Sequence, residues 1–245
     1  MNAQAQFAFN NSNSLTSTAN HSGNSITVVD INNDGLDDIV KMDQASILII
    51  EMQNQNGSYN HYDLGDVGAG SVWGMAVADV DHNGWKDVAT GAGSTSLVKL
   101  SWSGSTIVAS TSVLAGGYFV QNITFGDFDN DGWVDLGVCD DNDFMKIYKN
   151  NSGTLTLSST LINTNINPGM TYGGDPYDSG NYGSVWLDYD SDGDLDLYIA
   201  HCRQSTSSYT DQRRRDRLFV NNGSGVFTEN AASTGLEAPT DYKQT

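Results

Sequence analysis

Short apolar runs occur in pairs along the chain, and each pair encloses a segment rich in aspartate and glycine. The first runs of the pairs are residues 26–29, 75–78, 123–125 and 185–187. The second runs are residues 39–40, 88–89, 136–138 and 197–200. The runs have the length of strands and are rich in β-branched and aromatic residues, and we find no 3.6-residue apolar stripe typical of a helix. The pattern therefore predicts β-structure.

A turn signal lies downstream of each pair, between two further strand-like runs. These signals are Asn56-Gly57, Ser103-Gly104, Asn151-Ser152-Gly153 and Asn222-Gly223-Ser224-Gly225. Each unit then holds four antiparallel strands, and a period of about 40–50 residues with four strands is typical of a β-propeller blade. A parallel β-helix has a shorter period, and a doubly wound fold needs intervening helices. We therefore predict an all-β fold, a β-propeller with four visible blades of four antiparallel strands.

The blade boundaries follow from the repeat, and we interpret residues 1–245 as a single β-propeller domain or segment. The blades are expected at about residues 25–70, 71–116, 117–165 and 182–233. Residues 1–24 contain a possible closing strand, and residues 234–245 are interpreted as a connection to a further blade. This organisation predicts that the four blades are part of a larger ring.

The segment inside each pair of runs is a nine-residue acidic motif that begins at Asp30, Asp79, Asp127 or Asp188. Oxygen-bearing side chains stand at positions 1, 3, 5 and 9, and glycine at position 6 permits a sharp turn. Such a set of oxygens predicts a hard cation, to which the carbonyl of position 7 adds a further ligand. The predicted metal ligands are Asp30, Asn32, Asp34, Leu36, Asp38, Asp79, Asp81, Asn83, Trp85, Asp87, Asp127, Asp129, Asp131, Trp133, Asp135, Asp188, Asp190, Asp192, Asp194 and Asp196.

Calcium fits this pattern better than magnesium, because calcium accepts six to eight oxygens in a flexible geometry. We therefore expect about four structural Ca²⁺ ions. An EF-hand is excluded, since it needs a glutamate at position 12, where this chain has Lys41, Thr90, Val138 and Ile199. Turns without an ion are the alternative for a single copy, but turns do not require carboxylates at these positions in four copies. Motifs three and four have the most carboxylates and are expected to bind most tightly.

These motifs resemble the calcium loops of FG-GAP/VCBS-type repeats, the blades of integrin α-subunit propellers and of many secreted bacterial proteins. Residues 218–232 are also similar to the outer hairpin of the bacterial VCBS group. The resemblance covers about residues 25–235 and implies a propeller with structural calcium. It implies little about function, because this architecture hosts adhesion modules, lectins and some polysaccharide lyases. Asn32 and Asn83 depart from the acidic pattern, which predicts weaker sites in the first two motifs.

The charge of the chain limits its partners. Thirty acidic and 11 basic residues give a formal net charge of −19 and a pI near 4.1. Binding to nucleic acid or to an anionic membrane is therefore not expected, and no apolar run is long enough to insert into a membrane. We expect a secreted or cell-surface location, where calcium is abundant.

Two long insertions are the candidate binding surface. Residues 163–182 and 203–217 enlarge connections that should lie on the face opposite the acidic motifs, and the second contains five of the basic residues. Loops on a rigid scaffold commonly bind partners, so we expect a protein or carbohydrate ligand there. The predicted ligand-binding residues are Tyr172, Asp175, Tyr177, Tyr182, Arg203, Tyr209, Arg213, Arg214 and Arg215.

The sequence favours a binding or adhesion module, and the alternative is a polysaccharide lyase or hydrolase built on the same propeller. The chain has no Gly-x-Ser-x-Gly element and its four histidines are scattered, with His201 the best candidate for catalysis. Enzymatic activity thus stays open but disfavoured. Trp73 and Trp186 are expected to pack in the core. Equivalent strand positions place Cys139 and Cys202 on matching faces, which argues against a disulfide.

Overall fold

The computed structural model describes residues 26–43, 46–68, 72–117, 119–158, 180–202 and 214–236. These residues form four sheets of four strands each. The first two sheets contain β1 (Ile26–Val29), β2 (Asp38–Asp43), β3 (Ile47–Gln53) and β4 (Tyr59–Asp66), then β5 (Gly74–Ala78), β6 (Asp87–Gly91), β7 (Ser94–Trp102) and β8 (Ile107–Gly116). The last two contain β9 (Val120–Gly126), β10 (Asp135–Asp140), β11 (Lys146–Asn150) and β12 (Leu155–Leu157), then β13 (Asn181–Leu187), β14 (Asp196–His201), β15 (Arg217–Asn221) and β16 (Phe227–Glu229).

Every sheet is an antiparallel meander in which strands that follow one another in the chain are neighbours. A single helical turn, α1 (Ala231–Thr234), follows the last strand. The prediction of an all-β chain with four four-stranded antiparallel units is therefore confirmed.

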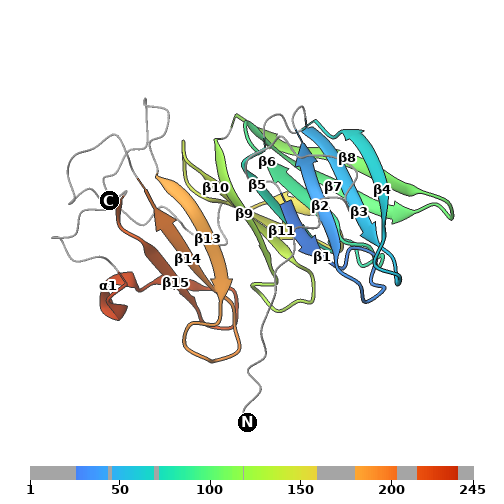
Figure 1. Cartoon of the computed structure of the whole chain (residues 1–245). Coiled ribbons are helices and arrows are strands. Elements are labelled where there is room, and N and C mark those ends of the chain that lie inside the picture. Colours follow the sequence, from blue (N-terminus) through green and yellow to red (C-terminus); the bar gives the residue numbers. More distant parts are fainter. Residues whose placement is uncertain are drawn as a thin grey trace, which may run out of the picture.

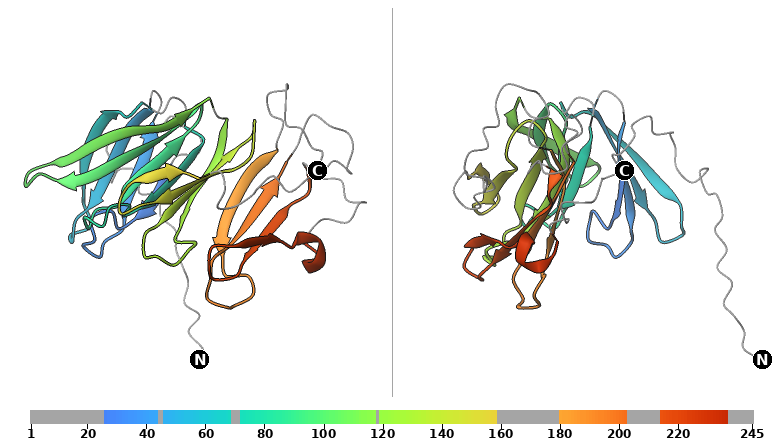
Figure 2. Two further views of the ribbon diagram at one scale, coloured as in Figure 1. Left: turned by 180° about the vertical axis from the view of Figure 1, so that it is seen from behind. Right: turned by 90° about the vertical axis from the view of Figure 1, so that its left-hand side faces the viewer.

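The four sheets lie side by side in chain order (Figures 1 and 2). Their first strands contact one another in the same order, β1 with β5, β5 with β9, and β9 with β13. Glycine permits the closest of these approaches. A Cβ atom added to Gly126 at the end of β9 would lie 2.7 Å from the ring of Trp186 in β13. Successive sheets therefore share a tightly packed seam.

Three apolar clusters fill the spaces between successive sheets. One joins the first two sheets through residues such as Ile50 and Val98, and a second joins the middle sheets through Leu97 and Leu136. The third joins the last two sheets. Strands β6 and β10 are buried along their whole length because sheets pack on both of their faces. The last strands β4, β8, β12 and β16 are instead half-buried or exposed at every residue except Ile107.

The two tryptophans expected in the core differ in burial. Trp186 is 9% exposed and packs against Phe128 and Phe227. Trp73 is 49% exposed, and its ring contacts Phe119 instead of the core. The prediction of core packing is thus wrong for Trp73, because this residue precedes β5 and belongs to none of the three apolar clusters.

Candidate metal centres

The four acidic motifs occupy the connections from the first strand to the second strand of each sheet. We number their positions 1 to 9 from Asp30, Asp79, Asp127 and Asp188, and call the motifs loops one to four. Position 9 is the first residue of β2, β6, β10 or β14. The loops therefore lie at the same end of each sheet, and only position 9 belongs to a strand.

All four loops have the same internal hydrogen bonds. In loop three the Asp127 carboxylate accepts from the N–H groups of Asp131 at 3.1 Å and Gly132 at 2.8 Å. The carboxylate at position 1 of the other loops accepts from the same two positions. The side-chain oxygen at position 5 accepts from the N–H of position 7 in every loop. The nine-residue sequence thus fixes a single loop conformation in all four copies.

This conformation requires left-handed backbone at two positions. Glycine at position 6 has φ between 86° and 94°, where other residues would be strained. Position 4 also has positive φ, at Asn33, His82, Asn130 and Ser191. Short polar side chains tolerate this region better than β-branched ones, and none of these four residues is β-branched.

Position 9 has a role that the sequence did not reveal. Its carboxylate is fully buried in every loop, and each of its oxygens accepts a backbone hydrogen bond. Asp135, for example, accepts from Phe128 N–H at position 2 and from Asn150 N–H at the end of β11. The other three loops repeat both bonds. Position 9 therefore ties its loop to the third strand of the same sheet.

Burial raises the pKa of the position 9 carboxyl groups in loops one to three. It raises the pKa of Asp87 to about 6 and that of Asp135 to about 7, and the charges of Asp81 and Asp129 respectively add to the effect. The pKa of Asp38 is raised for the same principal reason. A nearby positive charge would favour the ionised form of all three groups.

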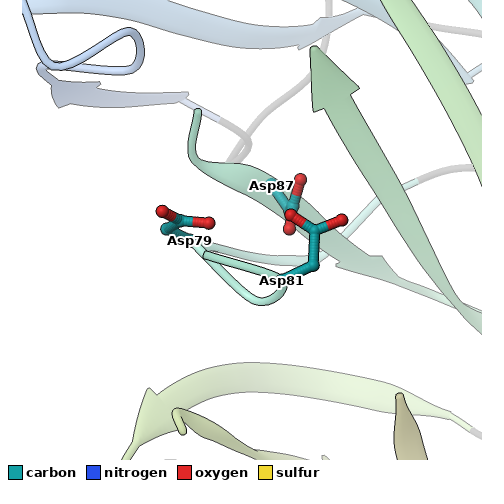
Figure 3. A group of neighbouring side chains, drawn as sticks. All are labelled: Asp79, Asp81 and Asp87. Atoms are coloured by element: carbon teal, nitrogen blue, oxygen red, sulfur yellow. The ribbon is translucent and has the colours of Figure 1, made fainter. Parts of the chain in front are cut away.

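The loops gather their carboxylates to different degrees. In loop two, oxygens of Asp79, Asp81 and Asp87 lie within 4.8 Å of one another, with the first two on the loop and the third at the start of β6 (Figure 3). Loop three brings together the equivalent Asp127, Asp129 and Asp135, whereas loop four brings together positions 1, 3 and 5. Within the described residues, loop one forms no such group of three acids, since Asn32 replaces the carboxylate at position 3.

Two oxygens in these groups lack any partner. Asp81 Oδ1 and Asp129 Oδ1 are buried, and neither has a hydrogen bond within the described residues. A buried oxygen without a partner costs free energy, which a bound cation would offset. The side chains at positions 1, 3, 5 and 9 offer only oxygen donors, which is the set that calcium prefers. The residues present therefore fit a calcium ion.

Comparison with known families agrees with this geometry. A model of the FG-GAP-like repeat matches residues 127–199. Residues 127–199 are therefore similar to an FG-GAP-like repeat, and we call this segment the FG-GAP-like repeat. It begins at the first aspartate of loop three and ends in β14, just after loop four, so it covers one full period. No curated protein matches the chain.

Lysines contact the acidic groups of two loops. Inside the FG-GAP-like repeat, Lys149 Nζ of β11 lies 2.5 Å from oxygens of both Asp129 and Asp131. Burial alone would lower the pKa of Lys149, but these hydrogen bonds outweigh burial and raise it. Lys99 Nζ of β7 lies 3.3 Å from Asp81 in loop two. Both lysines lie outside the nine-residue motifs, so the sequence pattern did not indicate them.

Loop four, at the end of the FG-GAP-like repeat, is the most exposed of the acidic groups. Asp188, Asp190 and Asp192 are all exposed, and none makes an ion pair with a described basic residue. Desolvation and then the charges of Asp192, Asp196 and Asp188 raise the pKa of Asp190. Among the described residues, the carboxylates of loop four therefore repel one another without a neutralising side chain.

Successive loops are joined by hydrogen bonds across the seams between sheets. Asn150 Nδ2 donates to the position 2 carbonyl of loop two, Val80, at 2.9 Å. Asn221 Nδ2 donates to the equivalent carbonyl of loop three, Phe128, at 2.7 Å. At the first seam the N–H of Lys86 donates to Ile31 at 2.8 Å. Position 2 thus binds its own position 9 through N–H and the next sheet through C=O.

Two further contacts link position 4 of one loop to position 7 of the next. The His82 ring stacks on Trp133 at 3.9 Å between centroids, and Asn130 Nδ2 donates to Asp194 Oδ1 at 2.7 Å. The loops therefore form a continuous row in which each one contacts the next.

The predicted ligand-binding residues fall only partly within the described chain. Tyr172, Asp175, Tyr177, Arg203, Tyr209 and Arg213 lie outside the described residues. Tyr182, Arg214 and Arg215 are half-buried and lie near the start of β13 and β15, beside the end of β14. This end of the sheet is opposite loop four, as the connection order predicts.

The candidate catalytic histidine is buried, and the two cysteines do not form a disulfide. His201 is 7% exposed, and burial together with the charge of Arg217 lowers its pKa to about 4. It is therefore neutral at pH 7. Cys139 and Cys202 are both free, and burial raises the pKa of the Cys139 thiol to about 12.

Proposed function

We propose that this chain is a calcium-stabilised β-propeller module that binds a protein or glycan partner outside the cell. The observation that carries the proposal is the repeated loop. Four copies share one conformation, and two of them contain a buried carboxylate oxygen, in an all-oxygen donor set, that has no hydrogen bond to any described residue. The FG-GAP-like repeat at residues 127–199 supports the same reading.

The sheet arrangement supports the propeller. The first strands β1, β5, β9 and β13 contact one another in order, and the last strands are exposed. This is the pattern expected for blades whose first strands surround an axis and whose last strands form the rim. The sheets are the blades in this proposal.

Calcium would supply charge neutralisation and fixed coordination at each loop. The side chains at positions 1, 3 and 5 would hold the ion, and position 9 would hold the loop against the third strand through its two backbone bonds. Because position 2 of one loop also binds the next sheet, each ordered loop would stabilise a seam. In this proposal calcium is structural and acts at a distance from the partner.

The location and the partner surface are part of the same proposal. Extracellular calcium is in the millimolar range, which suits modules of modest affinity. No helix in the described part of the chain is long and apolar enough to cross a membrane. The partner surface lies at the end of the sheets opposite the loops, and Tyr182, Arg214 and Arg215 are its described members.

We expect the protein to bind about four calcium ions, as measured by flow dialysis with radioactive calcium. The double substitution of Asp190→Ala and Asp192→Ala should remove about one of them, because it deletes two of the three carboxylates that loop four brings together. The matched control is Asp63→Ala with Asp66→Ala, which removes two exposed acids from β4 and should leave the count unchanged. Binding of no calcium by the unaltered protein would refute the metal sites.

The partner surface is tested separately, because its residues are far from the loops. A screen of glycans and surface proteins, run with and without chelator, would first identify a ligand. Replacement of Arg213, Arg214 and Arg215 by alanine should weaken the binding of that ligand by roughly tenfold or more, as expected for basic residues central to an interface. Calcium content and melting temperature should change little. Survival of binding in this variant, with loss in the Asp190→Ala, Asp192→Ala variant, would place the partner on the calcium face instead.

A further inference from the structure

Lys149 occupies the centre of loop three. Its Nζ lies 2.5 Å from Asp129 Oδ2, 2.5 Å from Asp131 Oδ2 and 3.9 Å from Asp135 Oδ1. These are positions 3, 5 and 9 of the motif, and at positions 3 and 5 the ammonium group bonds to carboxylates that would hold a metal ion. The side chain is 18% exposed. It is therefore a largely buried cation within an acidic site.

The four sheets can be aligned at this place by the position 9 hydrogen bonds. The third strand donates a backbone N–H to position 9 from Gln53, Leu100, Asn150 or Asn221. The preceding residue is the one that can reach the loop. That residue is Met52, Lys99, Lys149 and Val220 in sheets one to four.

These four residues differ in charge and in reach. Met52 Sδ accepts a hydrogen bond from Asn32 Nδ2 at 3.4 Å, which shows that this place faces position 3 in loop one as well. Lys99 contacts a single carboxylate, Asp81 at 3.3 Å, and also donates to the Gly153 carbonyl across the seam at 2.7 Å. The side chain of Val220 has no polar atom. A cation therefore faces loops two and three, and none faces loops one and four from this position.

We propose that Lys149 is a built-in counter-ion that competes with a divalent cation for loop three. The proposal rests on the metal sites proposed above. It separates two loops that carboxylate number ranks equally, since loops three and four have four carboxylates each but loop three has a lysine at this place and loop four has Val220. Calcium then binds loop four more tightly than loop three, and loop two, with the weaker Lys99 contact, is affected less.

The physical reason is charge balance. A divalent ion that enters loop three must either displace the ammonium group or lie a few ångströms from it, and both cost free energy. The long, flexible stem of lysine permits displacement. In the absence of calcium the same ammonium group neutralises part of the carboxylate repulsion. Loop three would thus stay ordered without an ion, whereas loop four would depend on one.

The test compares Lys149→Met with the unaltered full chain in calcium titrations by isothermal calorimetry. Methionine is the natural residue at the equivalent place in sheet one, so the fold should accept it. We expect one site to bind calcium roughly tenfold to a hundredfold more tightly, since one positive charge at the centre of the site is lost. The matched control is Lys146→Met on the same strand, whose ammonium group pairs with Asp143, outside the acidic loops, and which should leave all sites unchanged.

A second measurement separates this role from simple structural support. Without calcium, Lys149→Met should melt at a lower temperature than the unaltered protein, and saturating calcium should remove that difference. If Lys149 were purely structural, its replacement would lower the melting temperature equally with and without calcium and would not tighten calcium binding at any site. Unchanged or weaker calcium binding by Lys149→Met, or equal tightening by Lys146→Met, would overturn the proposal. Absence of calcium binding in the unaltered protein would instead refute the metal sites themselves.

Discussion

Excess chelator is expected to lower the midpoint temperature of thermal unfolding by about 10 °C or more. Each site filled at a hundredfold excess of calcium over its dissociation constant stabilises the fold by about 2.7 kcal/mol, and 1 kcal/mol corresponds to about 2–4 °C for a domain of this size. Chelation also leaves like charges within 4.8 Å of one another in loops two, three and four. Differential scanning calorimetry in calcium and in excess EGTA measures the shift.

Ionic strength provides the control for this experiment. Added sodium chloride screens repulsion between exposed carboxylates but does not fill a specific site. We therefore expect sodium chloride at matched ionic strength to restore only part of the lost stability, and calcium to restore all of it. A melting temperature that is the same in calcium and in EGTA would show that the loops are stable turns that need no ion.

The architecture and the loops could be predicted because their determinants are local. The bonds from positions 5 and 6 to position 1 span only four and five residues, so the nine-residue motif contains its own folding instructions. The same motif, repeated between apolar runs, also marks where the first strand of each sheet ends and the second begins. Four copies were therefore enough to predict four four-stranded sheets before any contact between them was known.

The residues that join the sheets could not be predicted in the same way. Lys149 follows position 9 of its loop by 14 residues and Lys99 by 12, because the connection between the second and third strands varies in length. In the last sheet an insertion extends the same interval to 24 residues, ending at Val220. A contact whose sequence separation varies from copy to copy leaves no periodic signal.

The asparagines that bond across the seams, Asn150 and Asn221, stand in a sequence context that is typical of turns. Asn150 and Asn221 each precede a second asparagine and a glycine-containing turn. Asparagine beside glycine is typical of turns, so the sequence indicated a hairpin and nothing more. Their buried amide groups, which bind the preceding sheet, became visible only when the sheets were placed side by side.

Replacement of Asn150 by alanine is expected to lower the free energy of unfolding by about 2–4 kcal/mol. Its side chain is 1% exposed, and its amide group donates to the carbonyls of Val80 at 2.9 Å and Val134 at 3.0 Å. Its Oδ1 accepts from Gly153 N–H at 2.8 Å. Alanine leaves these three backbone groups without their partner inside the seam, which costs more than the loss of the bonds alone.

The adjacent residue gives a matched control, because Asn151→Ala makes the same chemical change at an exposed position of the same turn. Urea unfolding in saturating calcium keeps the metal sites filled in both variants, so a difference between them reports the buried amide group of Asn150 and its three hydrogen bonds. We expect Asn151→Ala to lie within about 0.5 kcal/mol of the unaltered protein, as is usual for surface substitutions. Equal destabilisation by the two variants would mean that Asn150 supports only its own turn. A loss confined to Asn150→Ala would show that the buried amide group contributes stability that an exposed asparagine of the same turn does not.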